Sequence, residues 1–185
     1  MKKIHWEKSA SAFLIAAILL IAPALHAAEW VGTPAPVIKL ADQDNKLRSL
    51  QDFKGKWIAL YFYPKDKTPG CTQEAKKFRD YWNDYQQHNI TIIGVSGDNV
   101  SSHKDFATTH KLPFLLLADE NFEMAKAMGV ARGFGPLRFA SRQTFLIDPE
   151  GTIVYHYASV DTQKHAEQVL ADVIRLSANS DKPGN

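Results

Sequence analysis

Apolar positions in this chain follow two spacings, and segments of one spacing alternate with segments of the other. Residues 57–63 are almost continuously apolar, which is typical of a strand buried on both faces of a sheet. Between Ala75 and Tyr85 the apolar residues recur at helical spacing, which predicts one helix with its apolar side in the core. Strand and helix patterns continue to alternate along the chain, so the sequence predicts an α/β fold.

The same spacing patterns, together with turn residues, predict the remaining strands and helices. Leu40 and Leu47 frame a polar turn, which predicts a small leading hairpin. The turn Pro149-Glu150-Gly151 predicts a second hairpin near the end of the chain. Four further strands are expected at 91–95, 114–118, 143–147 and 152–157, and three further helices at 101–110, 122–128 and 162–176.

Cys71 is the single cysteine of the sequence, and its neighbours favour a chemical role. It stands in the segment Thr68-Pro69-Gly70-Cys71-Thr72, after the first buried strand and a short polar loop. Thr68 suits an N-cap and Pro69 suits the first helical position, so Cys71 falls in the first turn of a helix. Free backbone N–H groups and the helix dipole favour an anion there. We therefore interpret Cys71 as a nucleophile and not as a small buried hydrophobic residue.

The segment Pro64-x-x-x-Thr68-x-x-Cys71 resembles the active-site signature of the peroxiredoxins. Its fuller form, 68–72, is similar to the Q group, which includes the bacterioferritin-comigratory proteins. Three later segments resemble that family in the same order: 93–98 (IGVSGD), 117–119 (LAD) and 142–148 (RQTFLID). The resemblance implies a thioredoxin-like fold with a central mixed β-sheet flanked by helices, covering residues 29–176.

The resemblance also implies a role for each site residue. Cys71 would attack the peroxide as a thiolate, and Arg142 would favour the thiolate and stabilise charge on the leaving oxygen. Thr68 would hydrogen-bond the peroxide, and Pro64 would pack over the sulfur and limit solvent access. Glu74, one helical turn after Cys71, is a supporting residue that could orient an arginine. If the strand at 143–147 runs antiparallel, Arg142 lies beside Cys71.

Many members of the Q group carry a resolving cysteine five residues after the first, where this chain has Lys76. Without a second cysteine, the sulfenic acid must be reduced by an external thiol, which is thioredoxin-like, glutaredoxin-like or small. The leading interpretation is a thiol peroxidase that acts on hydrogen peroxide and organic hydroperoxides. The alternatives are a peroxide sensor or thiol-dependent binding protein that acts through Cys71 oxidation, and a non-catalytic relative of the same fold.

The composition of the chain limits the classes of binding partner that we expect. The formal net charge is +2, and three lysines against one glutamate in residues 1–28 account for it. No basic block or glycine-rich phosphate loop is present, so nucleic acid is not an expected partner. No cofactor or metal is expected, because His103 and His110 lack cysteine or carboxylate partners in the sequence and suit surface or cap positions. We expect a monomer or weak homodimer.

The ends of the chain predict processing and disorder. A basic start, an apolar run at 12–21 and small residues at Ala27 and Ala28 are typical of a secretory signal covering residues 1–28. The expected location is therefore the bacterial periplasm, with an uncleaved inner-membrane anchor facing the periplasm as the alternative. Residues 177–185 are polar and end with Pro183 and Gly184, which predicts a disordered tail.

Overall fold

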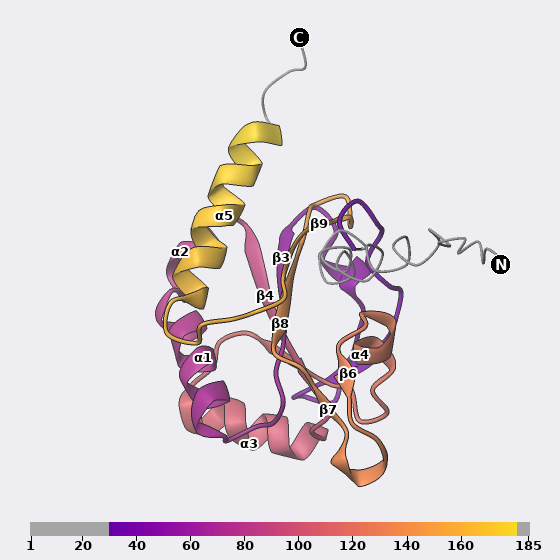
Figure 1. Cartoon of the computed structure of the whole chain (residues 1–185). Helices are drawn as coiled ribbons and strands as arrows, with labels where there is room; N and C mark the ends of the chain where they lie inside the picture. The colour runs from indigo at the N-terminus through magenta and orange to yellow at the C-terminus, as the bar shows by residue number, and fades with distance from the viewer. Residues whose placement is uncertain (1–29, 181–185) are drawn as a thin grey trace, which may run out of the picture.

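The computed structural model describes residues 30–180, so the predicted signal segment and residues 181–185 lie outside the described part of the chain. In this part a seven-stranded sheet forms the centre of the fold (Figure 1). Its strands run in the order β2 (Leu47–Arg48), β1 (Leu40–Asp42), β5 (Leu115–Ala118), β4 (Ile90–Ser96), β3 (Trp57–Phe62), β8 (Gln143–Ile147) and β9 (Ile153–Tyr157).

Strand directions in this sheet are mixed, as predicted. β3, β4 and β5 are parallel, whereas β8 runs antiparallel to β3 and pairs Phe62 with Gln143. The carboxyl end of β3 and the beginning of β8 therefore meet at one edge of the sheet. Both predicted hairpins are present, as the β1–β2 and β8–β9 pairs.

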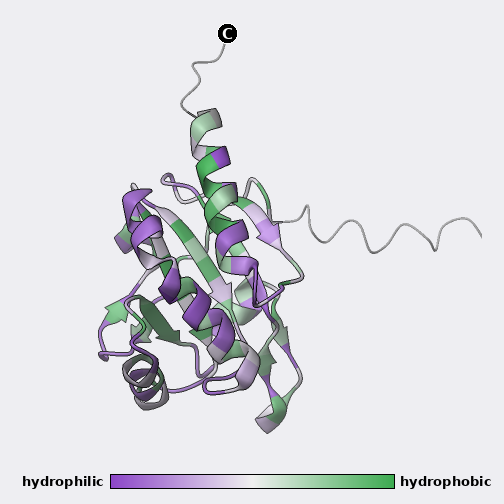
Figure 2. Cartoon of the chain, turned by 90° about the vertical axis from the view of Figure 1, so that its left-hand side faces the viewer, coloured by the Kyte–Doolittle hydropathy of each residue, from purple (hydrophilic) through white to green (hydrophobic). Residues whose placement is uncertain are grey.

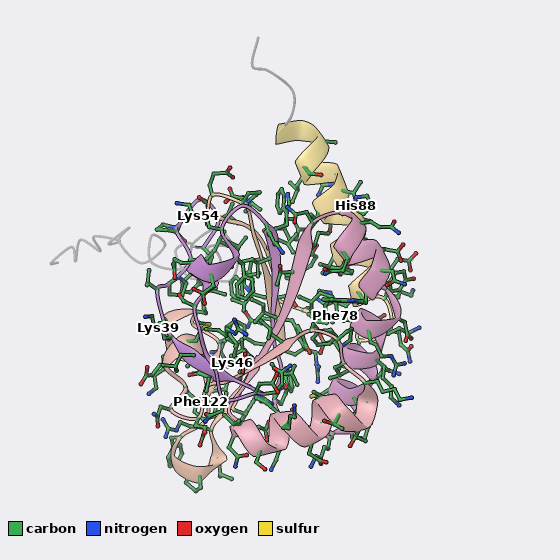
Figure 3. All side chains as sticks on the ribbon, turned by 180° about the vertical axis from the view of Figure 1, so that it is seen from behind. Lys39, Lys46, Lys54, Phe78, His88 and Phe122 are labelled. Carbon is green, nitrogen blue, oxygen red and sulfur yellow. The ribbon has the colours of Figure 1, made fainter. Side chains whose placement is uncertain are left out.

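Helices cover both faces of the sheet, which completes the predicted thioredoxin-like arrangement. One face packs against α1 (Pro69–Asp80), α2 (Trp82–Gln87), α3 (Val100–His110) and α5 (His165–Ser180). The other face packs against α4 (Glu123–Ala127) and the short 3-10 helix η1 (Leu50–Phe53). Figure 3 labels Phe78, a fully buried residue of α1 that lies between this helix and the sheet. The colours of Figure 2 show hydrophobic residues along the central strands, mostly hydrophilic residues on the helix that crosses in front of them, and many hydrophobic residues on α5, which leads to the C-terminus.

A third, small hairpin leads into β8. It consists of β6 (Ala131–Arg132), the 3-10 helix η2 (Gly135–Leu137) and β7 (Phe139–Ala140). Phe134 and Leu137 at its tip are 81% and 74% exposed, so the hairpin projects apolar side chains into solvent.

Three details differ from the sequence predictions. The helix expected from Ala75 to Tyr85 is two helices, because the chain turns at Tyr81. This turn brings Tyr85 into the core, where its hydroxyl donates to the Ala166 carbonyl at 2.7 Å. The predicted disordered tail at 177–185 begins too early, because α5 continues through Ser180. Its added residues contain no helix breaker, and the first proline beyond the helix is Pro183.

The third difference concerns His103, which was expected at the surface or at a helix cap. It is completely buried on the inner side of α3, together with Phe106 and Ala107. Its ring is buried because both ring nitrogens face hydrogen-bond partners inside the protein.

No helix within residues 30–180 combines the length and apolar character needed to cross a membrane.

The close contact of β4 with the Tyr61 ring gives a stability prediction. A Cβ at Gly94 would lie 2.7 Å from the Tyr61 hydroxyl oxygen and 2.8 Å from a methyl carbon of Leu116. We expect Gly94→Ala to lower the free energy of unfolding by about 1–3 kcal/mol, because these buried groups have little room to move.

Urea denaturation measures this change. Gly70→Ala is the matched control, because its Cβ would meet Arg142 Nη2 only at 3.5 Å and alanine is more favourable than glycine in a helix. A Gly94→Ala protein as stable as the wild type would contradict the packing described for Tyr61.

Candidate active site

The loop after β3 leads into the first turn of α1, which contains Cys71. Thr68 occupies the N-cap position with extended backbone angles (φ −75°, ψ 149°), and Pro69 is the first helical residue, as predicted. The Thr68 hydroxyl does not cap the helix but donates to the Lys65 carbonyl at 3.0 Å. Cys71 is 1% exposed, so its sulfur lies inside the protein and not at the surface.

Arg142 meets the sulfur from the neighbouring strand. It directly precedes β8, and the pairing of Gln143 with Phe62 brings it to the edge of the sheet where the loop to α1 begins. Its Nη2 donates to Cys71 Sγ at 3.1 Å. The two residues predicted to lie together are therefore in direct contact.

Glu74 completes an ion pair on the other side of the guanidinium. Arg142 Nη1 donates to Glu74 Oε2, and the glutamate is 1% exposed. Burial raises the pKa of Glu74 to about 7, while the positive charge of Arg142 acts in the opposite direction. Burial alone would lower the pKa of Arg142, but Glu74 and Cys71 raise it, so the guanidinium stays charged. The cation is thus held between a buried carboxyl and a buried sulfur.

Two buried oxygens beside this group have no hydrogen-bond partner among the described residues: Glu74 Oε1 and the Tyr61 hydroxyl. The Tyr61 ring stacks on Phe78 with centroids 4.8 Å apart. Burial, and then the charge of Glu74, raises the pKa of Tyr61 well above its ordinary value, so the phenol is neutral. Sequence analysis had assigned Tyr61 only to an apolar strand, and the strand pattern carries no signal that distinguishes a polar neighbour of the site from a core residue.

His165 is a second neighbour that sequence analysis missed. Its Nε2 lies 2.7 Å from the hydroxyl oxygen of Thr144, and the residue is buried at the start of α5. Burial, reinforced by the charge of Arg142, lowers the pKa of His165 to about 4. At neutral pH the ring is therefore uncharged and adds no second positive charge to the site.

The remaining predicted residue, Pro64, is half-buried at the beginning of the loop that leads to Cys71. Within residues 30–180 no cluster of histidine, cysteine and carboxylate side chains could hold a metal ion. The site itself brings together a buried sulfur, a guanidinium and a carboxyl group.

Residues 31–156 match the protein family described as the AhpC/TSA family. Peroxiredoxin Bcp of Bacillus subtilis is 41% identical over 151 residues, which cover 80% of this chain and 96% of the relative. The chloroplastic peroxiredoxin Q of Triticum aestivum is 42% identical over 149 residues, covering 80% of this chain. The chain spans only 64% to 66% of the length of this and other plant relatives that it matches.

A solved structure of the Xanthomonas campestris bacterioferritin comigratory protein has the same fold. It superposes with a TM-score of 0.74 at 30% sequence identity, covering 80% of this chain and 98% of that one.

The buried Glu74 predicts how stability changes with pH. Its pKa rises from 4.5 to about 7 on folding, so the folded state binds the proton more tightly than the unfolded chain does. The stability from this proton is fully present below pH 4.5 and is lost as the pH rises through about 7. Between about pH 5 and 8, we expect the wild type to lose about 2 kcal/mol more unfolding free energy than Glu74→Gln.

Urea denaturation of both proteins across this pH range measures the difference. Because glutamine keeps the shape but has no titrating proton, the two pH slopes, and not the absolute stabilities, are compared. Parallel slopes would show that Glu74 has the same proton affinity in the folded and unfolded states.

Proposed function

We propose that this chain, which belongs to the AhpC/TSA family, is a thiol peroxidase that reduces hydrogen peroxide and organic hydroperoxides through Cys71. The contact between Arg142 Nη2 and Cys71 Sγ, 3.1 Å long and in the first turn of α1, is the observation that carries this proposal. The relatives named peroxiredoxin Q and Bcp support it. The Xanthomonas campestris relative is described as having alkyl peroxide reduction activity, which supports organic hydroperoxides as substrates.

In the first half-reaction the Cys71 thiolate attacks one peroxide oxygen and the O–O bond breaks. The sulfur gains that oxygen as a sulfenic acid, and the other oxygen leaves as hydroxide or alkoxide and takes up a proton. A guanidinium in contact with the sulfur favours the thiolate and stabilises the charge that builds on the leaving oxygen.

The neighbours of the sulfur have supporting roles in this proposal. The Thr68 hydroxyl donates its hydrogen to the Lys65 carbonyl, so its oxygen is free to accept a hydrogen bond from the peroxide. Glu74 fixes the guanidinium through its ion pair with Arg142. Pro64 shields the sulfur and limits further oxidation of the sulfenic acid.

In the second half-reaction an external thiol attacks the sulfenic sulfur, forming a mixed disulfide and releasing water. A second thiol then breaks that disulfide and restores Cys71 as a thiol. The support for an external thiol is that the 185 residues contain no second cysteine. The reductant is a thioredoxin-like or glutaredoxin-like protein or a small thiol, and the enzyme works as a monomer or weak homodimer.

For the location, we propose export to the bacterial periplasm with residues 1–28 as a cleaved signal. The support is the sequence pattern of a basic start, an apolar run at 12–21 and small residues at Ala27 and Ala28. The alternative is retention of the uncleaved segment as an inner-membrane anchor.

Turnover tests the enzymatic function. Purified protein should consume many equivalents of hydrogen peroxide when a thioredoxin system, a glutaredoxin system or dithiothreitol is supplied. Cys71→Ser should lose this activity while keeping the wild-type circular dichroism spectrum, because a serine hydroxyl is scarcely ionised. Consumption that stops at one equivalent with every reductant would identify a peroxide sensor instead, and activity in the serine variant would overturn the assignment of the nucleophile.

Replacing the guanidinium should slow the peroxide step. Arg142→Met keeps much of the bulk but removes a charge-assisted hydrogen bond, so we expect the rate of oxidation to fall roughly ten- to a hundred-fold. Stopped-flow measurement of the reaction with hydrogen peroxide gives this rate. Arg138→Met is the matched control, because Arg138 is an exposed arginine of the preceding hairpin. Oxidation of Cys71 in this variant should proceed at close to the wild-type rate. Equal rates in both variants would mean that Arg142 has no part in activating the sulfur.

Mass spectrometry of protein from the native cell envelope tests export. The mature chain should begin near Ala28 or Glu29 and appear in the soluble periplasmic fraction. A form that begins at Met1 and stays with the membrane would support the anchor instead.

A further inference from the structure

A buried polar network lies directly before the catalytic turn and takes no part in the chemistry described above. Its centre is Asp66, in the loop between β3 and α1, whose carboxylate is almost completely buried. One carboxylate oxygen accepts the Tyr63 hydroxyl at 2.8 Å, and the other accepts the Ser102 hydroxyl at 2.8 Å. The second oxygen also lies 2.9 Å from Nδ1 of His103, which is completely buried on α3.

His103 faces an acceptor with each ring nitrogen. Its Nδ1 meets the Asp66 carboxylate, and its Nε2 lies 3.2 Å from the Leu117 carbonyl oxygen on β5. Burial opposes ionisation of Asp66, but hydrogen bonds led by that of His103 hold the pKa of its carboxyl below the ordinary value. The contact therefore joins the loop to α3 through buried, hydrogen-bonded side chains.

The loop backbone is anchored as well. The Asp66 N–H donates to Asp98 Oδ2 at 2.8 Å, and the same oxygen accepts the Ser96 hydroxyl at 2.7 Å. The next residue, Lys67, has a φ of +62°, in the left-handed region that lysine rarely adopts. This conformation persists because the surrounding bonds determine it.

The two proposed half-reactions make opposite demands on this loop. Oxidation by a small peroxide needs the Cys71 sulfur held at 3.1 Å from Arg142. Reduction by a protein thiol needs that sulfur to be reached by a second macromolecule, although Cys71 is 1% exposed in the closed structure. The loop and the first turn of α1 must therefore open before a protein thiol can attack. The groups that hold the loop closed control both rates.

We propose that Asp66 and His103 are a pair of positioning residues that hold the Cys71 loop in the peroxide-reactive arrangement and thereby limit reduction of the oxidised sulfur by a protein thiol. The inference rests on the proposed peroxidase function. Removing the pair shifts the loop from the closed arrangement towards the open one.

Separate measurement of the two half-reactions tests this pair. In His103→Gln, stopped-flow oxidation by hydrogen peroxide should slow at least about tenfold, because the loop is open for most of the time. Reduction of the sulfenic form by a thioredoxin should become several-fold faster, whereas reduction by dithiothreitol, which is small, should change less. Because oxidation becomes slower and reduction by thioredoxin faster, the result distinguishes positioning from a general loss of structure, which would slow both half-reactions together.

Asp105→Asn is the matched control, because it breaks an ion pair between the same loop and the same helix at the surface. Lys67 Nζ lies 2.6 Å from Asp105 Oδ2, and both side chains are more than half exposed. Both rates should stay at wild-type values in this variant. Asp66→Asn removes the charge from the other partner, so it tests the same pair if His103→Gln does not fold.

Amide hydrogen exchange makes the test independent of catalysis. Exchange of residues 64–72 should rise in His103→Gln and in Asp66→Asn, while exchange in β3 and β4 stays at the wild-type level. A wild-type protein that does not react with peroxide would overturn the proposed function, yet the exchange comparison would still test the pair. Unchanged exchange in the loop, or oxidation and reduction rates that fall together, would overturn the positioning role.

Discussion

The contact between the Arg142 guanidinium and the buried Cys71 sulfur joins the central sheet to helix α1, and the site is built around it. A sulfur excluded from water does not carry negative charge without a compensating cation, and the Arg142 guanidinium lies in position to supply it. The buried Glu74 carboxyl, one turn further along the same helix, contacts the other side of this partly exposed guanidinium. The three side chains therefore form one connected group, and removing Arg142 leaves both the sulfur and the carboxyl buried without that partner.

Much of this arrangement could be predicted, because its causes lie in strong local patterns. The buried strand at 57–63 and the Thr68-Pro69 helix start are explicit in the residues themselves. The meeting of Arg142 with Cys71 follows once β8 is antiparallel to β3, since the end of one strand then lies beside the beginning of the other. That direction came from family resemblance and not from hydrophobic spacing, which is the same for parallel and antiparallel strands when both faces are buried.

Features set by tertiary contacts were harder to predict. His103 shares a helix face with Phe106 and Ala107, so its spacing contained a signal for burial. Its partner Asp66 has no such signal, because a single aspartate in a polar loop is usually exposed to solvent. The turn at Tyr81 accompanies a hydrogen bond from the Tyr85 hydroxyl to the Ala166 carbonyl, which are 81 positions apart. No local propensity encodes such a contact. The buried phenol of Tyr61 looks identical in sequence to any aromatic residue of a core strand.

The order of the strands also constrains how the site forms during folding. Cys71 and Arg142 are 71 positions apart, and the contact between them requires β3 to have paired with β8. Contacts of such large sequence separation form late, after the loss of chain entropy has been offset elsewhere. A partly folded chain therefore contains an ordinary thiol without its guanidinium. Fast reaction of Cys71 with peroxide would consequently report that the native topology is complete, which makes this sulfur a chemical probe of its own folding.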